Sequence, residues 1–206
     1  MNNKKYYNEF FEEVTEQEVD QLDHFYISYF VDGRIKKTDH ISPNYFMGEY
    51  YLDAKENLQE KIQELCIEGG HRWVFYTQES AAFGYTLWNS EDIGEKGNLK
   101  FKGKQVLDSK NREIFNCSID ISNGQMEEAT KKYYNSDDIL LLTIDYDSQN
   151  KLVYAYDKQD TWGLDGGWPM DKEELIIVDA RIGAFPWDQH PYFHSAVPFL
   201  PESDII

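Results

Sequence analysis

The chain has 206 residues, 41% of them hydrophobic and 16% aromatic, and its 38 Asp and Glu residues outnumber its 20 Lys and Arg residues to give a net charge of −18. This aromatic content excludes an intrinsically disordered chain, and the length fits a single folded domain over residues 1–206. The negative charge argues against direct binding to DNA, RNA or anionic lipid, because their phosphates would be repelled.

The first 22 residues are expected to be helical. Their larger apolar side chains recur at helical spacing, and Thr15-Glu-Gln-Glu18 has the form of a capping box that opens a second short turn. A β-hairpin is predicted next. Residues 24–31 are aromatic and β-branched, and Asp32-Gly33 is a favoured two-residue turn before a second strand over residues 34–41.

The clearest predicted helix begins at Asp53-Ala-Lys-Glu56 and ends at Gly69-Gly70. One apolar stripe runs along it, made of Leu58, Ile62, Leu65 and Cys66. Strands are predicted over residues 72–77 and 84–88, and residues 90–97 are expected to form a loop.

Two further hairpins are predicted in the second half of the chain. Residues 98–107 and 112–121 pair across the turn 108–111, and residues 139–146 and 151–156 pair across the turn 147–150. Residues 125–134 are expected to form a short helix between them. The tail over residues 162–206 is rich in Gly, Pro and Trp, which rules out long helices, and one strand is predicted in it over residues 175–179. The predicted fold class is therefore α+β: antiparallel hairpins in one sheet system, two or three helices and an irregular aromatic C-terminal region packed on them.

Two groups of residues are candidates for binding a partner. Carboxylates near the third hairpin could face one surface together and steer a basic partner, and the Gly-rich stretch after them combines tryptophans with aspartates. The alternatives are a distributed solubility surface and a packed tryptophan loop that closes one end of the core. The candidates are Asp145, Asp147, Asp157 and Asp160 in the first group, and Trp162, Asp165, Trp168 and Asp171 in the second.

Signals for metal binding or catalysis are weak. His190 and His194 have the spacing of two zinc ligands on one helix face, but no cysteine pair precedes them and no H-E-x-x-H motif occurs. Two histidines in an aromatic loop is the preferred interpretation, and no metal or other cofactor is predicted. The chain has no nucleophile elbow and no phosphate-binding glycine loop. Cys66 and Cys117 lie outside any C-x-x-C pattern and are predicted to be buried free thiols.

The sequence therefore predicts a non-enzymatic, acidic, cytoplasmic protein that neutralises a basic partner protein by occlusion. No apolar segment approaches the roughly 20 residues of a membrane helix, and no signal peptide is expected. In composition alone the chain is similar to bacterial immunity proteins, which implies a secreted toxin domain as the partner. One alternative is a DNA mimic that inhibits a nuclease or defence complex. The other is a small hydrolase or carbohydrate-binding module centred on Trp162, Asp165, Trp168, Asp188 and His190.

Overall fold

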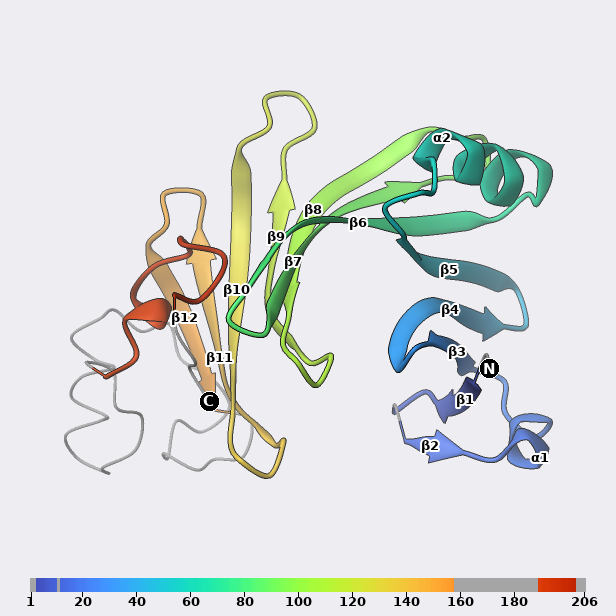
Figure 1. The fold of residues 1–206 in the computed structure, drawn as a ribbon, viewed down its shortest axis with the longest axis horizontal. Coiled ribbons are helices and arrows are strands. Elements are labelled where there is room, and N and C mark those ends of the chain that lie inside the picture. Colours follow the sequence, from blue (N-terminus) through green and yellow to red (C-terminus); the bar gives the residue numbers. More distant parts are fainter. Residues whose placement is uncertain (1–2, 11, 158–188, 203–206) are drawn as a thin grey trace. The chain divides into compact units, whose positions relative to one another are not determined.

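The computed structural model describes residues 3–10, 12–157 and 189–202, and it corrects the predicted fold class. The protein is mostly β rather than α+β, because twelve strands form one mixed sheet and only one described helix has seven or more residues. The strand order is β12-β11-β10-β9-β8-β7-β6-β5-β4-β3-β1-β2 (Figure 1). The strands are β1 (Asn3–Asn8), β2 (Glu13–Val14), β3 (Phe25–Val31), β4 (Arg34–Ser42), β5 (Tyr45–Leu52), β6 (Arg72–Ala82), β7 (Tyr85–Ile93), β8 (Leu99–Leu107), β9 (Glu113–Ile119), β10 (Met126–Tyr134), β11 (Leu140–Asp147) and β12 (Leu152–Asp157).

Two predicted helices are strands. Residues 3–8 of the expected N-terminal helix form β1, which pairs with β3 along its whole length, and only α1 (Glu16–Val19) is helical there, with the predicted capping box at Thr15. Residues 125–134 contain β10, which pairs with β9 on one side and β11 on the other. Local spacing suggested helices in both segments, but pairing with strands distant in the sequence outweighs that preference.

The three predicted hairpins are confirmed. Their turns use residues that tolerate left-handed backbone: Asp32 and Gly33 have φ of 50° and 79°, and Asn111 and Asn150 have φ of 63° and 65°. β7 runs through part of the predicted loop over residues 90–97 and ends at Ile93. Most of the meander is antiparallel, but β5 and β6 pair in parallel and are joined by the main helix.

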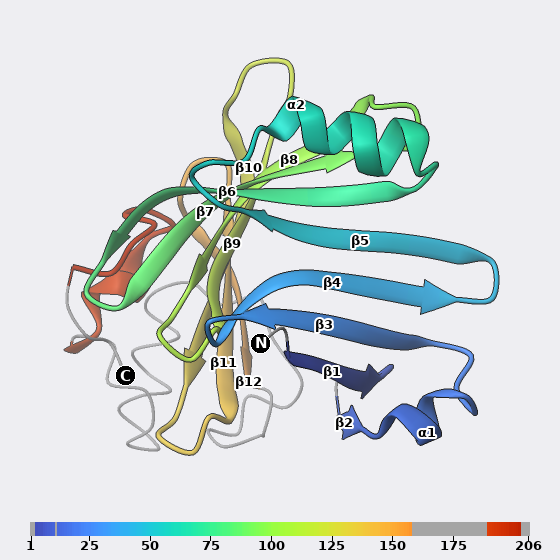
Figure 2. The same ribbon diagram turned by 45° about the vertical axis from the view of Figure 1, so that its right-hand side comes forward.

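The chain divides into two compact units: unit 1 comprises Met1–Gln78 and Asn89–Lys102, and unit 2 comprises Glu79–Trp88 and Gly103–Ile206. In unit 1 the main helix consists of α2 (Leu58–Lys61) followed by η1 (Ile62–Glu68). The η1 segment is a π-helix, which is wider than an α-helix. The main helix lies against one face of the sheet (Figure 2). Its cap, Asn57, lies four residues after the predicted start at Asp53, because Asp53 and Glu56 form a turn before it.

The helix covers a core made of Leu52, Ile62, Cys66, Trp73, Phe75 and Ile93. The predicted apolar stripe faces this core, with Leu58 and Leu65 packed at its margin. Gly48 permits the packing, because a Cβ atom added there would lie 2.1 Å from Cζ3 of Trp73. A residue with a side chain at position 48 would therefore displace the indole ring from the core.

Lysines and tyrosines stabilise strands of unit 1 by alternating across the sheet. Lys4 lies opposite Tyr29, Tyr29 opposite Lys37, and Lys37 opposite Tyr50. Nζ of Lys37 is 4.9 Å from the ring centroid of Tyr29, a distance at which a cation is attracted to the ring face. Because tyrosine packs through its ring and keeps a polar tip, this arrangement accounts for part of the aromatic content without a deep apolar core.

Unit 2 has its own core, over which the described C-terminal residues 189–202 pack. Phe115, Leu142, Ile144 and Tyr146 on the sheet are grouped with Tyr192, Phe193 and Ala196 of that segment. The buried ammonium group of Lys131 holds the segment, since its Nζ donates to the backbone oxygens of Tyr192 at 2.5 Å, Ser195 at 2.7 Å and Pro198 at 3.1 Å. The Tyr146 hydroxyl donates to the Phe193 oxygen at 2.6 Å. Residues 189–202 therefore pack on the sheet of unit 2.

Candidate interaction surface

Three carboxylates gather on one face of β10 and β11 in unit 2, and we call Glu128, Asp145 and Asp147 the acidic strand pair. The register places Glu128 directly opposite Asp147, and Asp145 opposite Thr130. Asp145 and Asp147 are two residues apart on one strand, so their side chains leave the sheet on the same side. The two strands therefore present three carboxylates within two cross-strand rows.

Hydrogen bonds orient part of this surface without neutralising it. Thr130 donates through Oγ1 to Oδ1 of Asp145 at 2.6 Å. Oδ1 of Asp147 accepts from the backbone N–H groups of Gln149 at 2.8 Å and Lys151 at 3.0 Å, which builds the turn before β12. Glu128 is exposed, and no ion pair of the acidic strand pair occurs within the residues that the structure describes. Like charges directly opposite each other on neighbouring strands destabilise a sheet, by about 0.2–1 kcal/mol.

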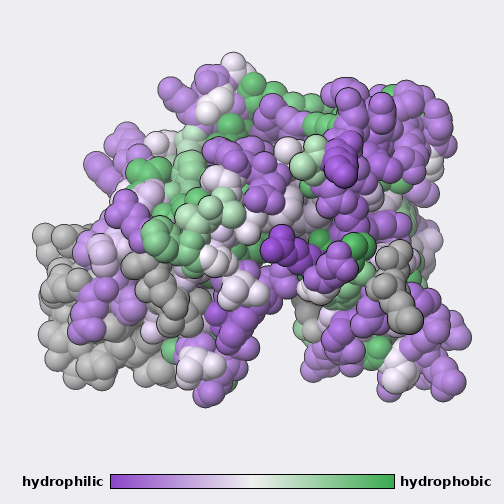
Figure 3. Space-filling view, viewed as in Figure 1, coloured by the Kyte–Doolittle hydropathy of each residue, from purple (hydrophilic) through white to green (hydrophobic). Residues whose placement is uncertain are grey.

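Most described basic residues, including Lys132 on β10, are already paired with other carboxylates of the same chain. They are Lys4, Lys5, Lys36, Lys37, Lys61, Arg72, Lys102, Lys104, Lys110, Arg112 and Lys132. Hydrophilic residues cover much of the face seen in Figure 3, with hydrophobic residues in small separate areas. Because the cations are engaged internally, the surplus negative charge is left to face solvent or a partner.

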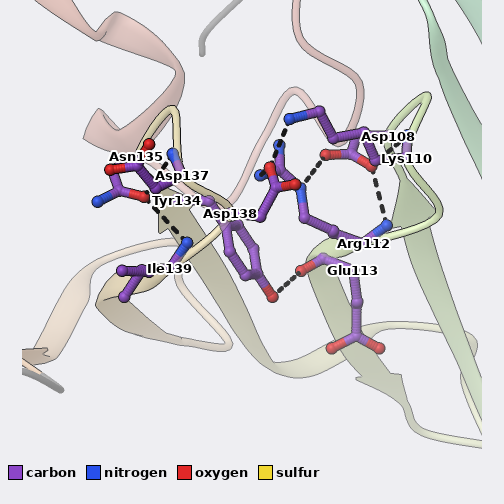
Figure 4. Close-up of polar contacts among 9 residues, drawn as sticks. All are labelled: Asp108, Lys110, Arg112, Glu113, Tyr134, Asn135, Asp137, Asp138 and Ile139. Atoms are coloured by element: carbon purple, nitrogen blue, oxygen red, sulfur yellow. Dashed lines mark hydrogen bonds and ion pairs between the residues drawn. The ribbon is translucent and has the colours of Figure 1, made fainter. Parts of the chain in front are cut away.

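An ion-pair cluster between two turns of unit 2 shows what a compensated acidic site looks like in this chain (Figure 4). Arg112 donates through Nε to Oδ2 of Asp108 and through Nη1 to Oδ1 of Asp138, both at 2.6 Å. Lys110 donates to the same Asp138 oxygen at 2.5 Å, and this bond holds the pKa of Asp138 below its usual value. The cluster ties the turn after β8 to the turn after β10. Its carboxylates meet cations, whereas those of the acidic strand pair do not.

Tyr134 completes this cluster. Its hydroxyl donates to the backbone oxygen of Glu113 at 3.2 Å, and the guanidinium carbon of Arg112 lies 4.7 Å from its ring centroid. Burial, together with the Glu113 charge, raises the pKa of Tyr134 to about 12, so the group stays a neutral donor. The cluster therefore fixes the ends of strands.

The structure brings together only part of the predicted partner site. Asp145 and Asp147 share a face as expected. The backbone of Asp157 pairs with that of Leu142, which is not on the face that carries Asp145. Asp160, Trp162, Asp165, Trp168 and Asp171 lie outside the described residues, as do Asp188 and the strand predicted over residues 175–179. Sequence analysis missed Glu128, because a helix over residues 125–134 would not place it opposite Asp147.

The two histidines of the weak metal signal lie in or next to η3 (Pro191–His194), a single 3₁₀ turn. The ring of His190 packs 5.4 Å from that of Tyr133, centroid to centroid, and burial lowers the pKa of His190. In residues 3–10, 12–157 and 189–202 no group of three His, Cys, Asp or Glu side chains is placed to hold a metal ion. His190 belongs to the aromatic packing of the C-terminal segment, with ring contacts to Tyr133 and Phe193.

Three other groups have the residue types of nucleophiles but not the environment. Burial lowers the pKa of Lys131 to about 7, but its ammonium group is fully enclosed and engaged by three carbonyl oxygens. Cys66 and Cys117 are buried free thiols, as predicted, and burial raises the pKa of each to about 11. A thiol with a raised pKa is a poor nucleophile at neutral pH.

Comparison with known proteins finds no family model, no curated protein and no solved structure that matches the chain. In the described part of the chain, no helix has both the length and the apolar character to cross a membrane.

Proposed function

We propose that this protein is a non-enzymatic binding protein that captures a basic partner protein through the acidic strand pair. The observation that carries the proposal is the uncompensated pair Glu128–Asp147, which lies directly opposite across two strands in a chain whose described cations are mostly engaged elsewhere. A pair of like charges that weakens the sheet and has no cation as an ion-pair partner among the described residues is best explained by a ligand of opposite charge.

Electrostatic steering supplies the mechanism. Carboxylates on a chain of net charge −18 attract a basic protein over about one Debye length, roughly 8 Å at physiological salt, and raise the association rate. On contact, Glu128 and Asp147 would each gain a cation, which removes their mutual repulsion. A partner held on this surface would be inhibited by occlusion, as immunity proteins inhibit their toxins.

The test compares two double variants that remove the same charge. Glu128→Gln with Asp147→Asn removes it from the acidic strand pair, and Glu68→Gln with Glu95→Gln removes it from two exposed positions of unit 1. Each is used, at low and high salt, to capture a basic protein from the producing cells and to bind a decalysine peptide as a defined probe.

We expect the first variant to bind both at least tenfold more weakly and with a smaller salt dependence, and the second to resemble the natural protein. If both variants bind the captured protein and the peptide equally weakly, the net charge alone determines binding, which would contradict the proposal. A DNA mimic would instead recover a nuclease whose DNA competes for the protein. Turnover or binding of a small ligand with no captured protein would favour the hydrolase or carbohydrate-binding alternative.

A further inference from the structure

The turn between β6 and β7 contains a phenylalanine in a conformation that phenylalanine disfavours. Phe83 and Gly84 have φ of 54° and 84°, both in the left-handed region. This two-residue turn favours Asn, Asp or Gly at its first position. The other described non-glycine residues in this region follow that preference: they are Asp32, Asn111, Asp138 and Asn150. Phe83 is therefore the exception, and its bulky side chain makes the conformation more costly.

Packing within the described chain does not compensate for this strain. The Phe83 side chain is 67% exposed and belongs to neither hydrophobic core. Its flanking residues are small, with Ala81 and Ala82 before it and Gly84 after it. An aromatic residue that is both strained and exposed is destabilising in the free protein, and such sites are typical of functional contacts.

The turn lies against a second turn that is itself braced. A Cβ atom added at Gly84 would lie 3.8 Å from Cβ of Ser109, so the turn lies beside the turn between β8 and β9. Asp108 braces that second turn by accepting from the backbone N–H groups of Lys110 and Arg112 at 2.9 and 2.8 Å. The ion-pair cluster of Figure 4 then fixes it to the turn after β10. A side chain presented from a braced turn loses little conformational entropy when it binds.

We propose that Phe83 is an anchor residue that inserts into an apolar pocket on the basic partner protein. The apolar ring and its uncharged flanks fit an apolar pocket on the partner. The net charge of −18 on the whole chain favours a partner whose surface around that pocket is basic. This inference deepens the proposed function and rests on it for the basic character of the partner. The acidic strand pair speeds association, while Phe83 slows dissociation.

The first test replaces Phe83→Asn, which creates the Asn-Gly sequence that this turn favours. We expect the fold to become more stable, by about tenfold in the folding equilibrium constant, because the left-handed strain is relieved. Binding of the captured partner should weaken at least tenfold, mainly through faster dissociation. The matched control is Phe101→Thr, which removes a phenylalanine 43% exposed in β8 and should leave binding unchanged. An unchanged affinity or a less stable fold in Phe83→Asn would overturn the inference.

The second test works without a known partner. A photo-reactive phenylalanine analogue is placed at position 83 or at position 101 in the producing cells, and cross-linked proteins are identified. We expect a basic protein cross-linked from position 83 only. No cross-link at 83, an acidic product, or equal products from both positions would overturn the inference. A product at 83 whose yield is undiminished with Glu128→Gln and Asp147→Asn would overturn the acidic surface and leave the anchor standing.

Discussion

The buried side chain of Lys131 should make the stability of the protein rise with pH. Its side chain is fully enclosed, and burial lowers its pKa from 10.5 to about 7 in the folded protein. In the unfolded chain the group regains the ordinary value, so between pH 7 and pH 10.5 the unfolded state binds more protons. Stability from this group therefore rises with pH across that window, by at most about 1.4 kcal/mol per pH unit.

The measurement is the free energy of unfolding in urea at pH 7, 8 and 9 for the natural protein and for Lys131→Met. Methionine fills similar volume but cannot titrate, so the difference between the two proteins isolates the Lys131 proton. We expect the free energy of unfolding of the natural protein, relative to that of the variant, to increase as pH rises. A difference that stays constant or shrinks would show that the pKa of Lys131 is not lowered on folding. The three carbonyl oxygens would then hold the proton in the folded state as firmly as water holds it in the unfolded chain.

The remaining predictions concern packing. In Lys131→Met the C-terminal segment loses three hydrogen bonds, so we expect thiol reagents to label Cys117, in the core of unit 2, at least tenfold faster while Cys66 in unit 1 is unchanged; equal acceleration of both would indicate general unfolding. Gly48→Ala should lower the free energy of unfolding by about 1–3 kcal/mol, because the added methyl group would overlap the Trp73 ring; an unchanged urea midpoint would contradict that packing.

The hairpins were predictable because each is specified by residues close together in the sequence. Asp32-Gly33 specifies a tight turn by its own chemistry, and the β-branched and aromatic strands on either side need no distant partner to be recognised. The main helix was also predictable, because Leu58, Ile62, Leu65 and Cys66 form a stripe and glycines follow. Its start was placed too early, since Asn57 rather than Asp53 is the cap.

The missed elements depend on contacts between residues far apart in the sequence. Tyr6 is followed by apolar residues at helical spacing, which predicted a helix. In the structure it lies opposite Ile27 of β3 and is buried there. Lys131 is a charged residue in a core position, which a pattern of apolar and polar residues assigns to the surface. Its acceptors come from a segment more than 60 residues away, so only the folded chain explains it.

The candidate surface was predictable only where it depends on local sequence patterns. Asp145 and Asp147 follow from the alternation of a strand whose hairpin was correctly predicted. Glu128 required the register of β10 against β11, which places it opposite Asp147. Phe83 required a backbone angle, because in the sequence it is an ordinary aromatic residue next to a glycine.

Glu128 and Asp147 are proposed to stay opposite each other for binding, at a cost in stability. The most direct measurement takes one protein, Glu128→Gln with Asp147→Asn, and determines both its free energy of unfolding and its association rate with the captured basic partner. We expect a rise in stability of about 0.2–1 kcal/mol together with a fall in association rate of at least tenfold. A less stable variant that binds at the natural rate would show that this pair does not serve binding.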